Sequence, residues 1–179
     1  EAGLRIGINA IRNDALAGLG IAVAVGASFI RVNVHTGVYA ADQGLIEGRA
    51  EETLRYRKQL GSRIAILADV NVKHATPLSE PDIVRAAKDT AYRGLADGLI
   101  VTGRATGEPV DADQLRRVRD AVPDRRVFVG SGATVDTVAS LLTLASGVIV
   151  GTGLKVGGDT SNPIDAALAT AFARAAGRG

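Results

Sequence analysis

The stretch Ile64-Ala65-Ile66-Leu67-Ala68-Asp69-Val70-Asn71-Val72-Lys73-His74 begins as an apolar run and becomes polar toward its far end. A continuous apolar run is typical of a strand that is buried on both faces, as in a parallel sheet. Because side chains alternate across a strand, Asp69, Asn71 and Lys73 are expected on one face. A buried face holds an acid, an amide and an amine together only when they pair with one another or bind a ligand. The pattern therefore indicates a functional site at the end of this strand.

A second stretch, Phe29-Ile30-Arg31-Val32-Asn33-Val34-His35, repeats the same arrangement. Arg31, Asn33 and His35 are expected on one face of this predicted strand. Two strands that carry polar groups toward their C-terminal ends are typical of an enzyme site, but they do not identify the reaction.

Short strands and longer helices alternate along the whole chain. The predicted strands cover residues 4–8, 29–34, 64–72, 99–101, 127–129 and 148–150. The predicted helices cover 13–25 (with Asn13 as N-cap), 49–60, 79–95, 111–123 (with Asp111 as N-cap), a stretch from 134, and 162–176. Residues 35–48 are predicted as a long loop, either a mobile lid or an ordinary surface loop.

Two architectures compete for these six βα units, a doubly wound open sheet and a (β/α)₈ barrel. A barrel takes ~250 residues and eight units, so the chain would be two units short. The polar strand ends favour the barrel, because its strands supply one site at the C-terminal face. We therefore predict that residues 1–179 form a single α/β domain of the barrel type.

Composition restricts the class of function. The net charge is only +2 and aromatic residues make up 3%, so no nucleic-acid partner is expected, and Arg116, Arg117 and Arg119 are interpreted as a solvated helix face. The absence of cysteine excludes thiolate chemistry and favours a cytoplasmic setting. No apolar run approaches the ~18–20 residues of a membrane span. Six strands would leave two unpaired edges, so a homo-oligomer is expected.

Glycine-rich turns follow the last two predicted strands, at Gly130-Ser131-Gly132 and Gly151-Thr152-Gly153. Glycine lets the backbone approach an anion closely, and the N–H groups of such turns point at it. In phosphate-binding barrels the site lies in the loops after strands seven and eight. The tandem pair therefore predicts a phosphate or phosphosugar site, with tight strand-to-helix turns as the plainer explanation of the glycines.

Other candidates lie at the remaining strand ends. Asp69 is predicted as a general base or substrate ligand, and Lys73 as a Schiff-base amine, proton shuttle or charge partner, unless the two only pair with each other. His35 and His74 are further catalytic candidates, and with Asp69 they could form a metal site. No closely spaced ligand pair supports a metal, so no cofactor is predicted and a metal stays the alternative. Further substrate contacts are expected at these positions: Asn9, Arg12, Asn71 and Thr102.

Taken in chain order, these segments resemble the BtpA/SgcQ family. The resemblance rests on the following segments: 8–14, 29–34, 42–48, 68–74, Val101-Thr102-Gly103 with Thr106-Gly107, and the two glycine-rich turns. It implies a TIM barrel of the ribulose-phosphate-binding type, from which this chain lacks the first two βα units and retains strands 3 to 8. Family members are predicted TIM-barrel enzymes or nucleosidases without an assigned reaction. The name-giving cyanobacterial member is needed for photosystem I stability and associates with thylakoid membranes.

Together, the residues and the resemblance predict an enzyme that acts on a small phosphorylated or nucleoside-like metabolite. The glycine-rich turns would hold the anion, while Arg31, Asn33, Asp69 and Lys73 would handle the reacting end. The alternative is a non-catalytic assembly factor of the photosystem I biogenesis type, which would carry an exposed apolar patch. The resemblance also adds peripheral membrane association to the expected cytoplasmic location.

Overall fold

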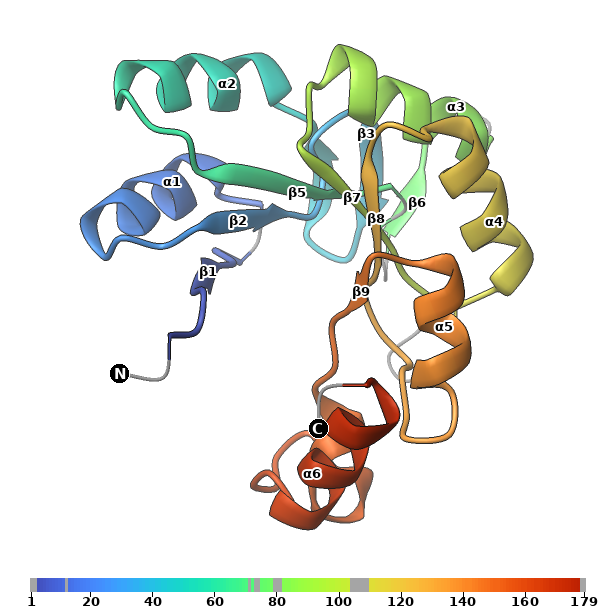
Figure 1. Ribbon diagram of the computed structural model, residues 1–179. Helices are drawn as coiled ribbons and strands as arrows, with labels where there is room; N and C mark the ends of the chain where they lie inside the picture. The colour runs from blue at the N-terminus through green and yellow to red at the C-terminus, as the bar shows by residue number, and fades with distance from the viewer. Residues whose placement is uncertain are drawn as a thin grey trace.

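The computed structural model describes residues 3–11, 13–70, 72, 75–78, 82–103 and 110–177. Its main sheet has six parallel strands in the order β1-β2-β5-β7-β8-β9 (Figure 1). They are β1 (Gly7–Ile8), β2 (Phe29–Val32), β5 (Ala65–Asp69), β7 (Gly98–Val101), β8 (Arg126–Val129) and β9 (Gly147–Val148). Within the described residues β1 pairs only with β2, and β9 only with β8. The six predicted strands are confirmed, and they form an open part of a barrel.

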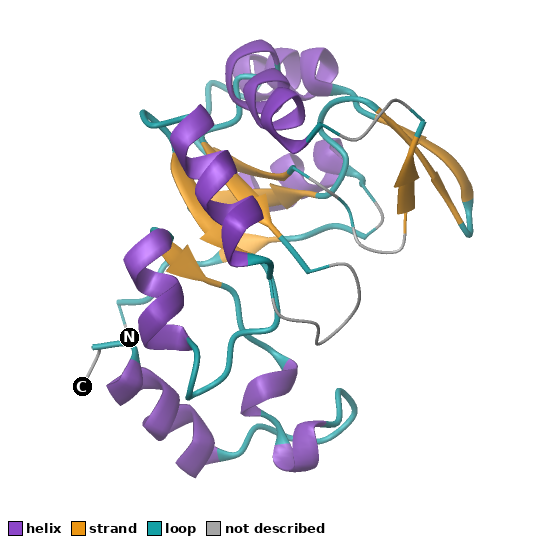
Figure 2. Cartoon of the chain, turned by 90° about the vertical axis from the view of Figure 1, so that its right-hand side faces the viewer, coloured by secondary structure: helices purple, strands orange, loops and turns teal. Residues whose placement is uncertain are grey.

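Helices cover one face of this sheet, except for the last helix, which lies beyond β9 at the bottom of Figure 1 (Figures 1 and 2). They are α1 (Ala15–Ala24), α2 (Ala50–Gln59), α3 (Ile83–Lys88) with the π-helical turn η1 (Asp89–Arg93), α4 (Ala112–Ala121), α5 (Val138–Leu144) and α6 (Ala166–Ala175). Two short 3₁₀ turns, η2 (Thr152–Leu154) and η3 (Val156–Gly158), follow β9. No helix in the described part of the chain is long and apolar enough to cross a membrane. The arginines interpreted as a solvated face pair with carboxylates at the surface, as Arg116–Asp113, Arg117–Asp82 and Arg119–Asp120.

Aspartate side chains mark where several helices begin, because a carboxylate satisfies the free N–H groups of a first turn. Asp111 caps α4 as predicted. Asp14, not Asn13, caps α1, so the prediction for Asn13 is wrong. The last helix begins only after its cap Asp165, and α5 begins at Val138, since residues 134–137 form a hydrogen-bonded turn.

The segment predicted as a loop between His35 and Gly48 is a β-hairpin instead. Strands β3 (Val38–Ala41) and β4 (Gly44–Glu47) pair antiparallel, and β6 (Ala75–Pro77) adds to β3 (Figure 2). Gly44 has a φ of 102°, a conformation that glycine adopts without a steric penalty, and this closes the tight turn. The Tyr39 hydroxyl donates to the Val70 carbonyl at 3.1 Å, which fixes this small sheet to the end of β5.

The two faces of the main sheet have different roles. Ile30, Val32 and Ile66 belong to the core that packs under α1 and α2, and Leu99, Val101 and Val127 to the core under α3 and α4. Alternation places Phe29, Arg31, Leu67, Asp69 and Phe128 on the opposite, concave face. A Cβ on Gly7 would lie 2.1 Å from the Phe29 ring, so glycine makes room for aromatic packing there. The polar strand ends therefore share the concave face, as a barrel requires.

Candidate functional site

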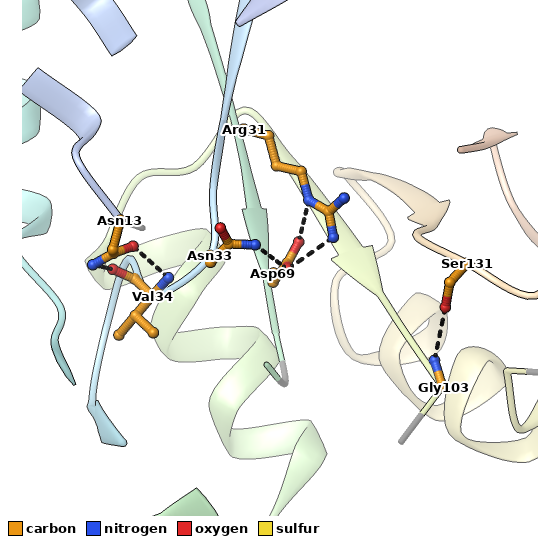
Figure 3. A network of polar contacts seen from close by, with 7 residues as sticks. All are labelled: Asn13, Arg31, Asn33, Val34, Asp69, Gly103 and Ser131. Atoms are coloured by element: carbon orange, nitrogen blue, oxygen red, sulfur yellow. Dashed lines mark hydrogen bonds and ion pairs between the residues drawn. The ribbon is translucent and has the colours of Figure 1, made fainter. Parts of the chain in front are cut away.

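Arg31, Asn33 and Asp69 form a hydrogen-bonded cluster on the concave face (Figure 3). Arg31 Nε and Nη2 donate to Asp69 Oδ1 and Oδ2, both at 3.0 Å. Asn33 Nδ2 donates to Asp69 Oδ2 at 2.9 Å. The Asp69 side chain is 2% exposed and that of Arg31 18%. The buried carboxylate is thus compensated by a bidentate guanidinium and an amide, an arrangement that sets its position firmly.

Strand register explains why these residues meet. Strands β2 and β5 are parallel neighbours, with Arg31 opposite Leu67 and Val32 opposite Ala68. One step further along, Asn33 reaches the level of Asp69. Because parallel strands end at the same edge of a sheet, the polar ends of both segments come together there. The two segments that the sequence analysis singled out therefore contribute to one cluster.

Gly130 brings a third strand to the cluster. A Cβ at this position would lie 2.5 Å from Thr102 Cγ2 and 3.4 Å from Arg31 Nη2. Only a residue without a side chain lets Thr102, which is buried, and the Arg31 guanidinium approach the end of β8 this closely. The guanidinium therefore lies beside the start of the first glycine-rich turn. Asn9 is exposed after β1, and the described residues show no hydrogen bond between it and this cluster.

The two glycine-rich turns enclose one cavity. It has a volume of about 390 Å³, and its lining includes Gly130, Ser131, Gly132, Gly151, Thr152 and Gly153. A Cβ on Gly153 would lie 2.8 Å from the Ala133 carbonyl oxygen, so this glycine lets the turns lie against each other. Gly132 has a φ of 73°, which turns the chain between β8 and α5. The structure thus brings together all six residues predicted to bind phosphate.

Backbone donors line this cavity. The N–H groups of Ser131, Gly132 and Ala133, and those of residues 151–153, donate to no acceptor among the described residues. The N–H of Gly130, in contrast, continues the sheet by donating to the Val101 carbonyl at 2.8 Å. The Gly103 N–H donates to Ser131 Oγ at 3.4 Å (Figure 3), which ties the first turn to the end of β7. Open N–H groups on two adjoining turns are suited to the oxygens of an anion.

Asn13 has a role that the sequence did not reveal. Its φ is 62°, in the left-handed region that asparagine tolerates better than most residues. Its side chain donates to the Val34 carbonyl at 2.8 Å and accepts from the Val34 N–H at 2.6 Å. The amide therefore takes the place of a neighbouring strand and fixes the end of β2 just beyond Asn33.

Tyr39 is a second residue that sequence reasoning missed. Its side chain is buried, and the pKa of its phenol is raised by burial and, to a smaller extent, by the charge of Asp69. The alternation of the hairpin strands was the signal that could have indicated a buried tyrosine, but those strands were taken for a loop.

His35 does not face the cluster, so the expectation that it shares a face with Arg31 and Asn33 is wrong. Strand β2 ends at Val32, and the alternation does not extend as far as residue 35. His35 is buried, and its Nε2 donates to the Gly94 carbonyl at 2.8 Å. Burial lowers the pKa of this imidazole, although the Gly94 carbonyl partly opposes the shift. Its Nδ1 is buried and has no partner in the described part of the chain.

Four predicted site residues lie outside the described residues: Arg12, Asn71, Lys73 and His74. The alternative metal site predicted from His35, His74 and Asp69 therefore includes one residue, His74, that lies outside the described residues. Among the described residues, no group of three or more histidine, aspartate or glutamate side chains could hold a metal ion.

Comparison with known sequences identifies relatives of this chain in one protein family. The model of the BtpA family matches residues 1–178. The photosystem I biogenesis protein BtpA of Synechocystis sp. PCC 6803 is 52% identical over 174 residues, which are 97% of this chain and 61% of that protein. The sgc region protein SgcQ of Escherichia coli K12 is 32% identical over 160 residues, 89% of this chain and 59% of that protein. The chain thus spans about three fifths of the length of these relatives.

Solved structures with the same architecture are barrels. N-(5′-phosphoribosyl)anthranilate isomerase from Pyrococcus furiosus matches with a TM-score of 0.61 at 14% identity, over 99% of this chain and 76% of that one. A structure named KDPGal matches with a TM-score of 0.58 at 17% identity, over 95% of this chain and 67% of that one. At this identity the likeness concerns the fold alone, and it agrees with six parallel strands of a TIM-type barrel.

Proposed function

Since this chain belongs to the BtpA family and folds as part of a TIM barrel, we propose that it is an enzyme acting on a small phosphorylated or nucleoside-like metabolite. The observation that carries the proposal is the cavity between the two glycine-rich turns, with its open backbone N–H groups. A phosphate monoester supplies the oxygens that such donors bind. The phosphorylated class of metabolite is therefore favoured over an uncharged nucleoside.

In this proposal the reacting end of the substrate lies at the Arg31–Asn33–Asp69 cluster, beside the cavity. Arg31 and Asn33 offer donors to substrate oxygens, and Thr102 borders the space between the cluster and the first turn. Lys73 and His74 keep the roles predicted from the sequence, an amine for covalent or proton-transfer chemistry and a second titratable group. Asn9, Arg12 and Asn71 remain proposed substrate contacts.

Binding of a phosphate ester tests the cavity directly. Glycerol 3-phosphate should raise the thermal unfolding midpoint of the chain, whereas glycerol should not, because a ligand that binds only the folded state stabilises it. Gly153→Ala places a methyl group 2.8 Å from the Ala133 carbonyl and should remove this shift. Gly20→Ala is the matched control, since its Cβ would meet only the Tyr56 hydroxyl, at 3.5 Å. No shift with the parent chain, or an equal shift in Gly153→Ala, would argue against the phosphate site.

Turnover tests the chemistry. Sugar phosphates and nucleosides are screened for conversion, and a substrate once found is tested with Lys73→Ala and Asp69→Asn. Both variants should lose turnover by about 100-fold or more, Lys73→Ala because an acid–base group is lost and Asp69→Asn because Arg31 loses the charge that orients it, while glycerol 3-phosphate still stabilises them. Unchanged turnover in Lys73→Ala would remove that residue from the proposal.

A non-catalytic assembly role is the second candidate, and two observations favour it. The Synechocystis relative at 52% identity is named a photosystem I biogenesis protein. In addition, apolar side chains are exposed on α1 and just after it, with Ile21 at 47% and Val25 at 56%. In this reading the chain should co-sediment with lipid vesicles or purified photosystem I, and Ile21→Ser with Val25→Ser should abolish that association. Absence of association in the parent chain would leave the enzyme proposal alone.

A further inference from the structure

Arg31 presents two hydrogen-bonding edges, and Asp69 uses only one of them. The edge formed by Nε and Nη2 is taken up by the Asp69 carboxylate, at 3.0 Å for each bond. The other edge, formed by Nη1 and the second N–H of Nη2, donates to nothing in the described part of the chain. Figure 3 shows the remaining nitrogen of the guanidinium directed away from Asp69.

The guanidinium is held rigidly and its side chain is partly exposed. Asp69, which is 2% exposed and is itself fixed by a bond from Asn33, holds the guanidinium in one orientation, and the Arg31 side chain keeps 18% of its surface exposed. A guanidinium that is already oriented loses little rotamer freedom when it binds a second planar group. Its fork of two parallel N–H groups matches the two oxygens of a carboxylate.

The open edge also adjoins the anion cavity. Arg31 Nη2 lies 3.4 Å from the position that a Cβ on Gly130 would occupy, and Gly130 is part of the cavity lining. A small molecule bound through its phosphate at the glycine-rich turns would therefore reach the guanidinium with its other end.

From these observations we infer that the substrate is a phosphorylated carboxylic acid, whose carboxylate binds the open edge of Arg31 while its phosphate binds the glycine-rich turns. The inference rests on the proposed phosphate site and adds the second recognition group. Asp69 is then a positioning residue, which acts through Arg31 because both of its carboxylate oxygens already accept hydrogen bonds from Arg31 and Asn33.

Two small phosphate esters separate the two recognition groups. Phosphoglycolate carries a phosphate and a carboxylate, whereas hydroxyethyl phosphate has a hydroxymethyl group in place of the carboxylate. Calorimetric titration of the chain should show that phosphoglycolate binds about ten-fold more tightly or better, as expected for one bidentate charged contact. Arg31→Lys keeps the positive charge and the ion pair but loses the fork, so the preference should fall to about two-fold or less. The affinity for hydroxyethyl phosphate should fall by much less than the affinity for phosphoglycolate.

Two more variants make the result specific. The double substitution Arg31→Gln with Asp69→Asn replaces the ion pair by a neutral amide pair and should also lose the preference for phosphoglycolate. This variant tests the inference even if Arg31→Lys folds poorly. Arg126→Met removes a positive charge from the opposite end of β8 and should keep the preference.

Each alternative result has a definite meaning. Equal binding of the two esters by the parent chain, or a preference that survives in Arg31→Lys, overturns the carboxylate assignment and leaves the phosphate site standing. Failure of both esters to bind overturns the phosphate site and this inference with it.

Discussion

Replacing Arg31 with methionine leaves the Asp69 carboxylate in place without its guanidinium. That side chain is 2% exposed, so water cannot take over the role of the lost guanidinium, and the bond that it accepts from Asn33 carries no full positive charge. Breaking a buried ion pair by removing one member costs about 3–5 kcal/mol in unfolding free energy. Asp69→Leu leaves Arg31 unpaired instead, but this side chain is 18% exposed and can be hydrated in part. The expected cost of Asp69→Leu is therefore smaller, about 1–3 kcal/mol.

The double variant, Arg31→Met with Asp69→Leu, gives the third free energy of unfolding. It replaces the ion pair by two apolar side chains of similar size, a change that is often neutral or stabilising. The two single costs, about 4–8 kcal/mol together, should therefore exceed the cost of the double variant by about 4 kcal/mol or more. A coupling of this sign is expected for groups in direct contact.

Urea unfolding followed by circular dichroism measures all four chains, with a common slope as the check that the unfolded states are comparable. Arg126→Met is the control, because an exposed arginine should change the free energy of unfolding by no more than about 0.5 kcal/mol. The reasoning is refuted if Arg31→Met costs no more than Asp69→Leu, or if the two single costs simply add in the double variant.

Further expectations concern the fold around the site. Asn13→Ala should lower the unfolding free energy by about 2–3 kcal/mol, from two lost hydrogen bonds and left-handed strain, and Asn13→Gly by less; equal urea midpoints for the two would contradict the strain. Because burial lowers the pKa of His35 below 6.5, this imidazole is protonated in the unfolded chain before it is protonated in the folded one as the pH falls. Between about pH 7.5 and about pH 5.5 the parent should thus lose more unfolding free energy than His35→Asn, and equal losses would rule this out. Strands β1 and β9 each have an outer edge that pairs with no further strand in the described residues, and these edges should drive self-association, so a single species of 18.4 kDa in light scattering would speak against it.

The parallel sheet could be predicted because its signal is local. The apolar run at 64–68 and its counterpart at 29–32 each mark a strand, and their alternation fixes which side chains face the concave side. The prediction that Arg31, Asn33 and Asp69 lie on the same side of the sheet is therefore confirmed by their hydrogen bonds. The alternation holds only within the regular strand, which is why the same argument was wrong for His35, three residues beyond the end of β2.

What the sequence did not predict depends on contacts between distant segments. The hairpin of β3 and β4 is fixed by its pairing with β6 and by the bond from the Tyr39 hydroxyl to the Val70 carbonyl, contacts that the sequence of the two strands does not indicate. Asn13 looked like a helix cap because the adjoining Asp14 performs that task, and its real partner, Val34, is 21 residues away. Neither relation has a local signature, since each is set by tertiary packing.

Gly130 links the two halves of the proposed site. Its own N–H continues the sheet to Val101, so β8 is held in register up to this residue, and the N–H groups that follow are free of the ladder. The same residue admits Thr102 Cγ2 and Arg31 Nη2 to space that any side chain would fill. Gly130 is therefore the point where the sheet ends and the first open N–H donors of the cavity begin. The guanidinium edge of Arg31 lies beside the same residue. A ligand held by both groups would be short, because Gly130 lines the cavity and its Cβ position lies 3.4 Å from Arg31 Nη2.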